Sequence, residues 1–143
     1  MLTHLTIEQC SYQQWAWPDC QKIRKIVFIV EQHVPDLLEW DVADVKAIHL
    51  LVRADARPVA CARVLPDGHI GRMAVLKEWR GRGVGAALLQ YAVNICRELP
   101  VAQAQLSAQS HAIGFYARAG FIVCSSPYLD ANIPHVDMVL KLV

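Results

Sequence analysis

Two arginines and three glycines lie close together in residues 79–88, with the sequence WRGRGVGAAL. Glycine lets the backbone approach a large group because no Cβ stands in the way. The free N–H groups at the start of a helix, together with the helix dipole, favour an anion. Arg80 and Arg82 can add charge-assisted hydrogen bonds to phosphate oxygens. The segment therefore predicts a turn that binds a phosphorylated ligand.

The residues on either side predict a strand before this turn and a helix after it. Residues 70–76 are mostly apolar. After the turn, apolar residues recur at helical spacing, at Val84, Ala87, Leu88, Tyr91, Ala92 and Ile95. No Lys-Ser/Thr follows the last glycine, which excludes a P-loop. No βαβ unit with a downstream acidic residue surrounds the turn, which excludes a dinucleotide fingerprint. Taken alone, the turn also fits a tight bend with two solvated arginines.

Three groups of residues carry a resemblance to a known family. Arg80-x-x-Gly83-x-Gly85 resembles the coenzyme A loop of the GCN5-related N-acetyltransferases, the GNAT superfamily. Residues 112–121, AIGFYARAGF, resemble that family's Ala-x-x-x-Tyr-x-x-x-Gly-Phe segment. The N-terminal half resembles the ElaA/YjcF-like branch at Phe28, Glu31, Gln32, Val34, Pro35, Glu39, Asp41, Asp44 and His49. The resemblance covers most of the chain.

The resemblance implies an α+β fold and an acyltransferase activity. Residues 1–143 would form a single GNAT domain with a mostly antiparallel central sheet, splayed parallel strands and flanking helices. The enzyme would move an acetyl group from acetyl-CoA, its cosubstrate, directly to a primary amine within a ternary complex. The implied coenzyme-binding residues are Met73, Ala74, Val75, Arg80, Gly81, Arg82, Gly83, Val84, Gly85, Ala86, Gln109, Ala112 and Tyr116.

Acyl transfer needs a base for the amine, a donor for the oxyanion and an acid for the leaving thiolate. By resemblance Tyr116 is the acid. Many family members carry Asn where this chain has Gln109, so coenzyme contact there is an open point. The residues alone leave the base open, with Glu39, Asp41, His49 and His135 as candidates. A backbone N–H on the strand before the glycine turn is a candidate oxyanion donor.

Hydrophobic spacing predicts the elements that carry these residues. Strands are expected at 2–7, 47–53, 58–65, 69–76, 101–109, 121–124 and 135–142. Pro18 suits the first turn of a helix that buries Ile23, Ile26, Val27 and Val30, and a third helix, after the one that follows the glycine turn, is expected at 110–119. Trp15 and Trp17 are expected to be packed. Residues 34–45 are expected to form an acidic loop, and Arg63 and Arg72 to lie on a solvated strand face.

Composition excludes several other classes of protein. The net charge is +1 over 143 residues, without the excess of basic residues typical of nucleic-acid binders. The N-terminus lacks a basic, apolar signal sequence, and no apolar run approaches the length of a membrane span. The five scattered cysteines indicate reduced thiols in a cytoplasmic protein. The six histidines show no metal-ligand spacing, so no metal is expected.

The acceptor and two alternative functions remain open at this stage. The acidic loop favours a cationic acceptor, either a small amine or a protein lysine, and a homodimer is common among relatives. Arg24, Phe28 and the Glu39-x-Asp41-x-x-Asp44 pattern also resemble acyl-homoserine-lactone synthases, which use acyl-carrier protein and S-adenosylmethionine. A non-catalytic acyl-CoA sensor would keep the glycine turn without turnover.

Overall fold

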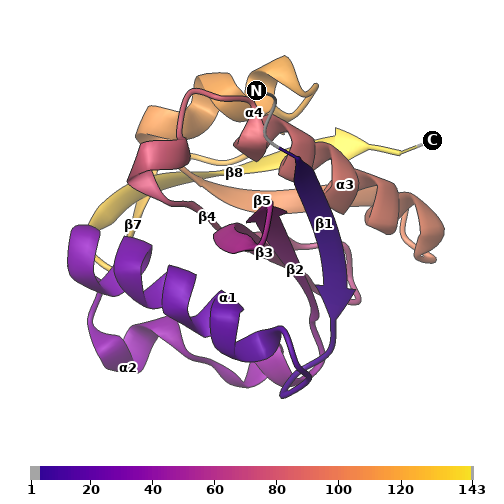
Figure 1. Ribbon diagram of the computed structural model, residues 1–143. Helices are drawn as coiled ribbons and strands as arrows, with labels where there is room; N and C mark the ends of the chain where they lie inside the picture. The colour runs from indigo at the N-terminus through magenta and orange to yellow at the C-terminus, as the bar shows by residue number, and fades with distance from the viewer. Residues whose placement is uncertain (1–3, 143) are drawn as a thin grey trace.

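Two antiparallel sheets form the centre of the protein in the computed structural model, which describes residues 4–142 (Figure 1). The first sheet has the order β1 (Leu5–Cys10), β2 (Ile48–Ala54), β3 (Arg57–Val64) and β4 (Ile70–Val75). The second has the order β5 (Gln103–Gln109), β8 (Ile133–Lys141) and β6 (Ile122–Val123), while β7 (Tyr128–Asp130) also pairs with β8. The predicted α+β fold with a mostly antiparallel sheet is confirmed.

The two sheets meet where β4 and β5 run parallel to each other. Within residues 4–142 one parallel β-bridge joins them, between His69, just before β4, and Gln105 on β5. Next to it, the N–H of Gln105 donates to the carbonyl of Gly68 at 3.0 Å. Beyond this point the strands belong to different sheets, so the predicted splay is confirmed.

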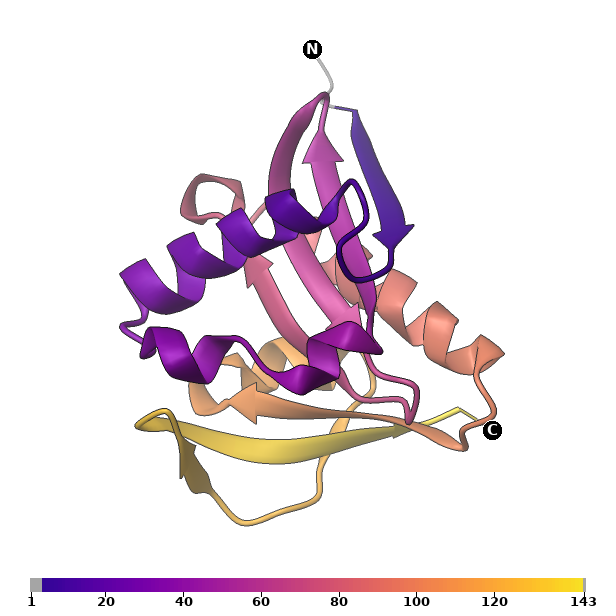
Figure 2. The same cartoon turned by 90° about the horizontal axis from the view of Figure 1, so that it is seen from below.

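Helices cover both faces of the first sheet (Figure 2). The helical segments are α1 (Trp17–Arg24), its π-helical continuation η1 (Lys25–Glu31), α2 (Asp36–Glu39), η2 (Val42–Val45), η3 (Lys77–Trp79), α3 (Val84–Glu98), η4 (Ser110–Ala112) and α4 (Ile113–Arg118). Alternate strand residues face opposite sides of a sheet. Leu51 on β2 is therefore buried in the cluster under α1, whereas Leu50 and Val52 are buried in the cluster that includes α3.

The N-terminal elements differ in part from the predictions. The first strand begins at Leu5 and extends to Cys10, because its partner β2 offers pairing as far as His49; the predicted start at Leu2 lies outside the described residues. Ile23 and Val27 are buried as predicted, but Ile26 and Val30 are exposed. An apolar residue on the far side of a helix that covers only one sheet has nothing to pack against.

Three other predictions are also corrected. Trp17 is buried, but Trp15 precedes α1 and stays 68% exposed beneath the guanidinium of Arg53. The predicted acidic loop contains α2 and η2. The helix expected at 110–119 is divided into η4 and α4 and ends at Arg118.

No helix within residues 4–142 combines the length and apolar character required to span a membrane. All five cysteines are free thiols, and four of them are buried. The prediction that most of the cysteines are buried is therefore confirmed.

Candidate active site

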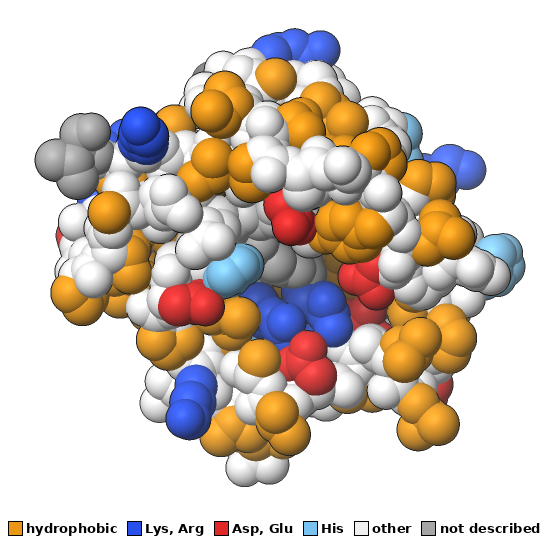
Figure 3. Space-filling view, turned by 180° about the vertical axis from the view of Figure 1, so that it is seen from behind, with side chains coloured by type: hydrophobic (Ala, Val, Ile, Leu, Met, Phe, Trp, Pro, Cys, Tyr) orange, Lys and Arg blue, Asp and Glu red, His pale blue; other side chains and the backbone are white. Residues whose placement is uncertain are grey.

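A pocket of about 1040 Å³ opens where β4 and β5 diverge. Its walls come from η1, β4, the glycine turn, β5, α4 and the β7–β8 hairpin. The space-filling view shows a hollow with basic side chains on its floor, surrounded by acidic, histidine and hydrophobic side chains (Figure 3). The basic residues that line the pocket are Arg63, Arg72 and Arg80.

The glycine turn forms one end of this pocket. Gly81 and Gly83 have φ angles of +73° and +82°, which favour glycine, and an added Cβ at either would meet nothing within 4 Å. Gly83 is the N-cap of α3, and no side chain caps that end. The first N–H groups of α3 therefore remain available to an anion. Gly85 is needed for packing, because a Cβ there would lie 3.3 Å from Cζ of Phe115.

The two arginines of the turn have partners within the protein. Arg80 forms a bidentate ion pair with Glu31 at 2.6 and 2.8 Å, and its Nε donates to the carbonyl of Val75 at 2.9 Å. The hydrogen bond from Arg80 holds the pKa of Glu31 below its usual range. Arg82 stacks on Trp79, with its Cζ 4.7 Å from the ring centroid.

Most of the predicted coenzyme residues line the pocket, but two do not. Those that line it are Met73, Ala74, Val75, Arg80, Gly81, Gly83, Gly85, Ala86, Gln109, Ala112 and Tyr116. Arg82 lies outside the lining, and Val84 is buried in the core beneath α3.

The backbone of β4 faces the gap at Val75. The N–H of Leu76 bonds to Val59 on β3 at 2.9 Å, and neighbouring residues of a strand point to opposite sides. Val75 therefore directs its N–H and carbonyl away from β3, where Arg80 reaches the carbonyl. This edge offers main-chain groups to a ligand in the gap.

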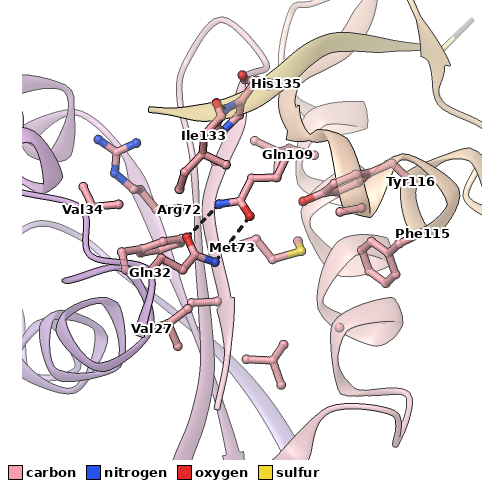
Figure 4. Close-up of a pocket in the computed structure, with 18 of the residues that line it drawn as sticks. Val27, Gln32, Val34, Arg72, Met73, Gln109, Phe115, Tyr116, Ile133 and His135 are labelled. Carbon is pink, nitrogen blue, oxygen red and sulfur yellow. Dashed lines mark hydrogen bonds between the residues drawn. The ribbon is translucent and has the colours of Figure 1, made fainter. Parts of the chain in front are cut away.

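Tyr116 extends from α4 toward the gap, facing Met73 and Gln109 (Figure 4). Phe115 and Phe121 pack around its ring, at centroid distances of 5.0 and 6.3 Å. Burial raises the pKa of Tyr116 to about 12. The phenol is therefore protonated at neutral pH, as a proton donor must be.

Three of the four candidate bases, His49, Asp41 and Glu39, are held by other groups of the protein. His49 is 1% exposed, lies outside the pocket lining, and uses Nε2 in a 2.9 Å bond to the carbonyl of Asp44. Burial lowers the pKa of His49. Asp41 also lies outside the lining and is paired with Arg63 and Arg72. Glu39 lines the pocket, but it is 2% exposed and paired with arginines.

His135 lines the pocket with its ring oriented by two neighbours. Its Nδ1 lies 2.6 Å from the carbonyl of Ile133, and its ring stacks on Tyr128. Since a carbonyl oxygen can only accept, Nδ1 carries the proton, and Nε2 of the neutral ring holds the lone pair. His135 pairs in register with Gln109 on β5, at the end of the strand that borders the gap.

Two glutamines bridge the pocket between η1 and β5. Nε2 of Gln109 donates to Gln32 Oε1 at 2.8 Å, and Gln32 Nε2 lies 3.4 Å from Gln109 Oε1 (Figure 4). Nε2 of His111 also lies 2.6 Å from Gln109 Oε1. Gln32 belongs to the Glu31-Gln32 pair of the resemblance, but its bridging position could not be inferred from its type.

Arg63 and Arg72 are not on a solvated face, contrary to prediction. Together with Arg24 they meet Glu39, Asp41 and Asp44 in one network, which we call the arginine–carboxylate network. Although burial disfavours its charge, hydrogen bonds from Arg24 and Arg63 hold the pKa of Asp44 below its usual range. The segment 36–45 covers this face of the sheet, and its carboxylates neutralise the arginines.

The family model for the acetyltransferase (GNAT) domain matches residues 7–142. The Bacillus subtilis protein YjcF, named as an uncharacterized N-acetyltransferase, is 33% identical over 124 residues, covering 84% of this chain and 89% of that protein. The crystal structure of Escherichia coli ElaA superposes with a TM-score of 0.84 at 28% identity, covering 98% of this chain and 100% of that one. The crystal structure of an acyl-CoA N-acyltransferase from Pseudomonas aeruginosa superposes with a TM-score of 0.83 at 29% identity, covering 96% of this chain and 99% of that one.

Proposed function

Because this chain belongs to the GNAT acetyltransferase family, we propose that it transfers an acyl group, acetyl by default, from acyl-CoA to a primary amine. One observation carries the proposal. A single pocket runs from the uncapped start of α3, through the gap between β4 and β5, to Tyr116 and His135. An anion-binding end, a slot lined by backbone groups, an acid and a base are the parts that this reaction needs.

The donor would be held mainly by backbone groups. The N–H groups at the start of α3 suit a pyrophosphate, because they are uncapped and the helix dipole is positive there. The exposed edge of β4 at Met73 and Val75 suits the amide groups of a pantetheine arm. A thioester carbonyl entering the gap would meet an N–H of this edge as its oxyanion donor.

His135 is the base in this proposal. Its Nε2 lone pair takes a proton from the amine as nitrogen attacks the thioester carbonyl. The C–S bond then breaks, and Tyr116 gives its hydroxyl proton to the leaving thiolate. Exchange with solvent returns a proton to Tyr116 and removes one from His135. The balance is one amide and one thiol formed from one amine and one thioester.

The test is turnover of acetyl-CoA with a panel of primary amines, followed by thiol release. Tyr116→Phe is expected to lower kcat by about tenfold or more, because it removes only the proton donor. His135→Gln is expected to lower kcat by about 100-fold. The Kd for acetyl-CoA is expected to stay within about threefold of the parent protein in both variants, since neither removes a phosphate contact.

Tyr91→Phe is the matched control, because Tyr91 bonds to Gln9 through its hydroxyl and lies outside the pocket lining. Equal turnover in Tyr116→Phe and Tyr91→Phe would contradict the assignment of the acid. Binding of acetyl-CoA without turnover of any amine would favour the sensor function.

A further inference from the structure

The far end of the pocket, away from the glycine turn, presents guanidinium groups. Arg63 at the end of β3 and Arg72 on β4 both line it, close in the fold to Gly71. Arg24, the third arginine of the network, is 1% exposed and does not line the pocket. The cations that a ligand would meet at this end are therefore Arg63 and Arg72.

Arg63 has one donor without a partner. Its Nη1 donates to Asp41 and Asp44 at 2.8 Å, and its Nη2 donates to Asp41 at 3.2 Å. The residue is only 7% exposed. Its Nε is buried and has no hydrogen-bond partner within residues 4–142. A buried donor without a partner is costly, so this atom is expected to have an acceptor in the functional state.

Gly71 separates this Nε from the pocket. It pairs in register with Arg63, and a Cβ built on it would lie 3.9 Å from Arg63 Nε. Gly71 also lines the pocket and has no side chain of its own to cover the guanidinium. An acceptor oxygen entering from the pocket would therefore pass over Gly71.

Arg72 brings a second guanidinium to this end through a β-bulge. The ladder between β3 and β4 shifts register here, with one residue on β3, Ala62, opposite two on β4, Arg72 and Met73, and Arg72 has a φ of +47°. A quarter (25%) of its side chain remains exposed. A bulged residue with positive φ is an unusual conformation, of the kind that occurs at binding sites.

The carboxylates near these arginines are already paired. Glu39 lines the pocket, but its carboxylate lies 2.8 Å from Arg24 Nε and 3.2 Å from Arg72 Nε. Asp41 and Asp44 do not line the pocket. Two carboxylates of the lining are exposed: Glu31, which is paired with Arg80 at the glycine turn, and Asp130, at the end of β7 and near His135 in the sequence. The network carboxylates are already bonded, whereas Arg63 Nε still lacks an acceptor, which favours an acceptor carboxylate at the arginines and an amine nearer to His135.

We infer that the acceptor is a small amino acid, whose carboxylate binds Arg63 Nε and Arg72 while its amine faces His135. This inference rests on the proposed function and narrows its acceptor class. It replaces the cationic acceptor expected from the acidic loop, because the network consumes those carboxylates. A planar carboxylate matches guanidinium donors better than a neutral carboxamide of the same shape does.

The experiment compares each acceptor with a matched analogue that lacks the charge. Acetyl-CoA turnover is measured with the twenty protein amino acids, β-alanine and 4-aminobutyrate, and with the carboxamide of each. We expect at least one amino acid to exceed its carboxamide in kcat/KM by about tenfold or more. Arg72→Gln is expected to reduce that ratio to below about threefold, with kcat/KM for the carboxamide little changed.

Two further variants distinguish a loss of carboxylate binding from a general loss of folded enzyme. Gly71→Val keeps all charges but covers the approach to Arg63 Nε, so it is expected to raise KM for the amino acid and not for the carboxamide. Arg57→Gln is the control, because Arg57 is exposed at the start of β3 and lies outside the pocket lining. Arg57→Gln is expected to keep the parent protein's ratio of kcat/KM between the amino acid and its carboxamide.

The outcomes distinguish this inference from the proposed function. If no amino acid is preferred over its carboxamide, whether other amines are acetylated or not, the carboxylate site is overturned. Acetylation of amines without a carboxylate would then leave the acyltransferase proposal standing. If the parent protein fails to bind acetyl-CoA by calorimetry, the proposed function itself fails.

Discussion

The two ends of the pocket are built in different ways. The glycine-turn end consists of backbone from one continuous segment, where Gly81 and Gly83 turn the chain and the start of α3 supplies N–H groups. The arginine end presents side chains from β3 and β4, and these are held from behind by the arginine–carboxylate network, in which Arg24 pairs with Glu39 and Asp44. The first end depends on local conformation, and the second depends on tertiary packing.

This difference has consequences for how each end tolerates change. A substitution in the turn is expected to remove ligand binding and leave the fold intact, because a Cβ added at Gly81 or Gly83 would meet nothing within 4 Å and the strain of the positive φ is confined to the turn. A substitution in the buried network is expected to remove stability, because charges would remain buried without partners.

The largest expected effect is on stability, in Arg24→Met. Arg24 is 1% exposed and bonds to Glu39 and Asp44 at 2.8 Å, so its loss leaves two carboxylates buried without it. We expect the free energy of unfolding, measured in urea, to fall by about 3–5 kcal/mol. Arg53→Met is the comparison, since Arg53 pairs with Glu8 and Asp19 nearer the surface and its loss is expected to cost about 0–1 kcal/mol. Equal losses of unfolding free energy in the two variants would show that the buried ion pairs stabilise the fold no more than the surface ion pairs do.

The second effect is acid sensitivity of the arginine end. The network holds the pKa values of Asp41 and Asp44 below their usual range. Stability from a lowered carboxyl pKa is present above the unfolded pKa, about 3.9, and is lost as pH falls through the folded value. The urea concentration at the midpoint of unfolding of the parent protein is therefore expected to decrease as the pH is lowered below about 4.

Glu39 affects the pH dependence of stability in the opposite sense to Asp41 and Asp44. Burial raises its pKa despite the hydrogen bond from Arg24, so its protonation at low pH favours the folded state. Arg24→Met is expected to show a weaker acid dependence than the parent protein, since it removes a partner that lowers the pKa of Asp44. The same acid slope in both proteins would argue against the network as its source.

The smallest effect concerns the Arg80–Glu31 ion pair at the glycine-turn end. Glu31→Gln is expected to release Arg80 from its ion pair, so that its guanidinium can turn to a phosphate. Because both side chains are more than a third exposed, the expected gain is modest, a Kd for acetyl-CoA lowered by about threefold in calorimetry. Glu98→Gln, at the exposed end of α3, is the control for net charge. Weaker binding in Glu31→Gln would mean that the ion pair supports the site.

The sequence predicted the glycine-turn end better than the arginine end, for a physical reason. The turn, the helix after it and the strands β2 to β4 follow from neighbouring residues, and the observed bounds of these three strands lie within one residue of those predicted. Arg63 was assigned to the solvated face because alternation gives the side of a strand but not what covers that side. Its partner Asp44 lies 19 residues away, in a segment that contains no strand or long helix.

The base illustrates the same limit. His135 could be named as a candidate from its type, but its distinction from His49 depends on tertiary contacts. His135 lines the pocket and its Nδ1 bonds to a backbone carbonyl. His49 is 1% exposed, and its Nε2 is bonded to the carbonyl of Asp44. No periodicity in the sequence separates these two environments.

Calorimetric titration of acetyl-CoA into Gly83→Glu tests the central claim most directly. A carboxylate at the N-cap of α3 would repel a phosphate and would occupy a position with φ of +82°. Gly114→Glu is the matched control, since it adds the same charge on α4 in open space outside the pocket lining. We predict that the parent protein and Gly114→Glu bind acetyl-CoA, and that Gly83→Glu binds about 100-fold more weakly or not at all. Binding of S-adenosylmethionine alone by the parent protein, or undiminished acetyl-CoA binding by Gly83→Glu, would contradict the account.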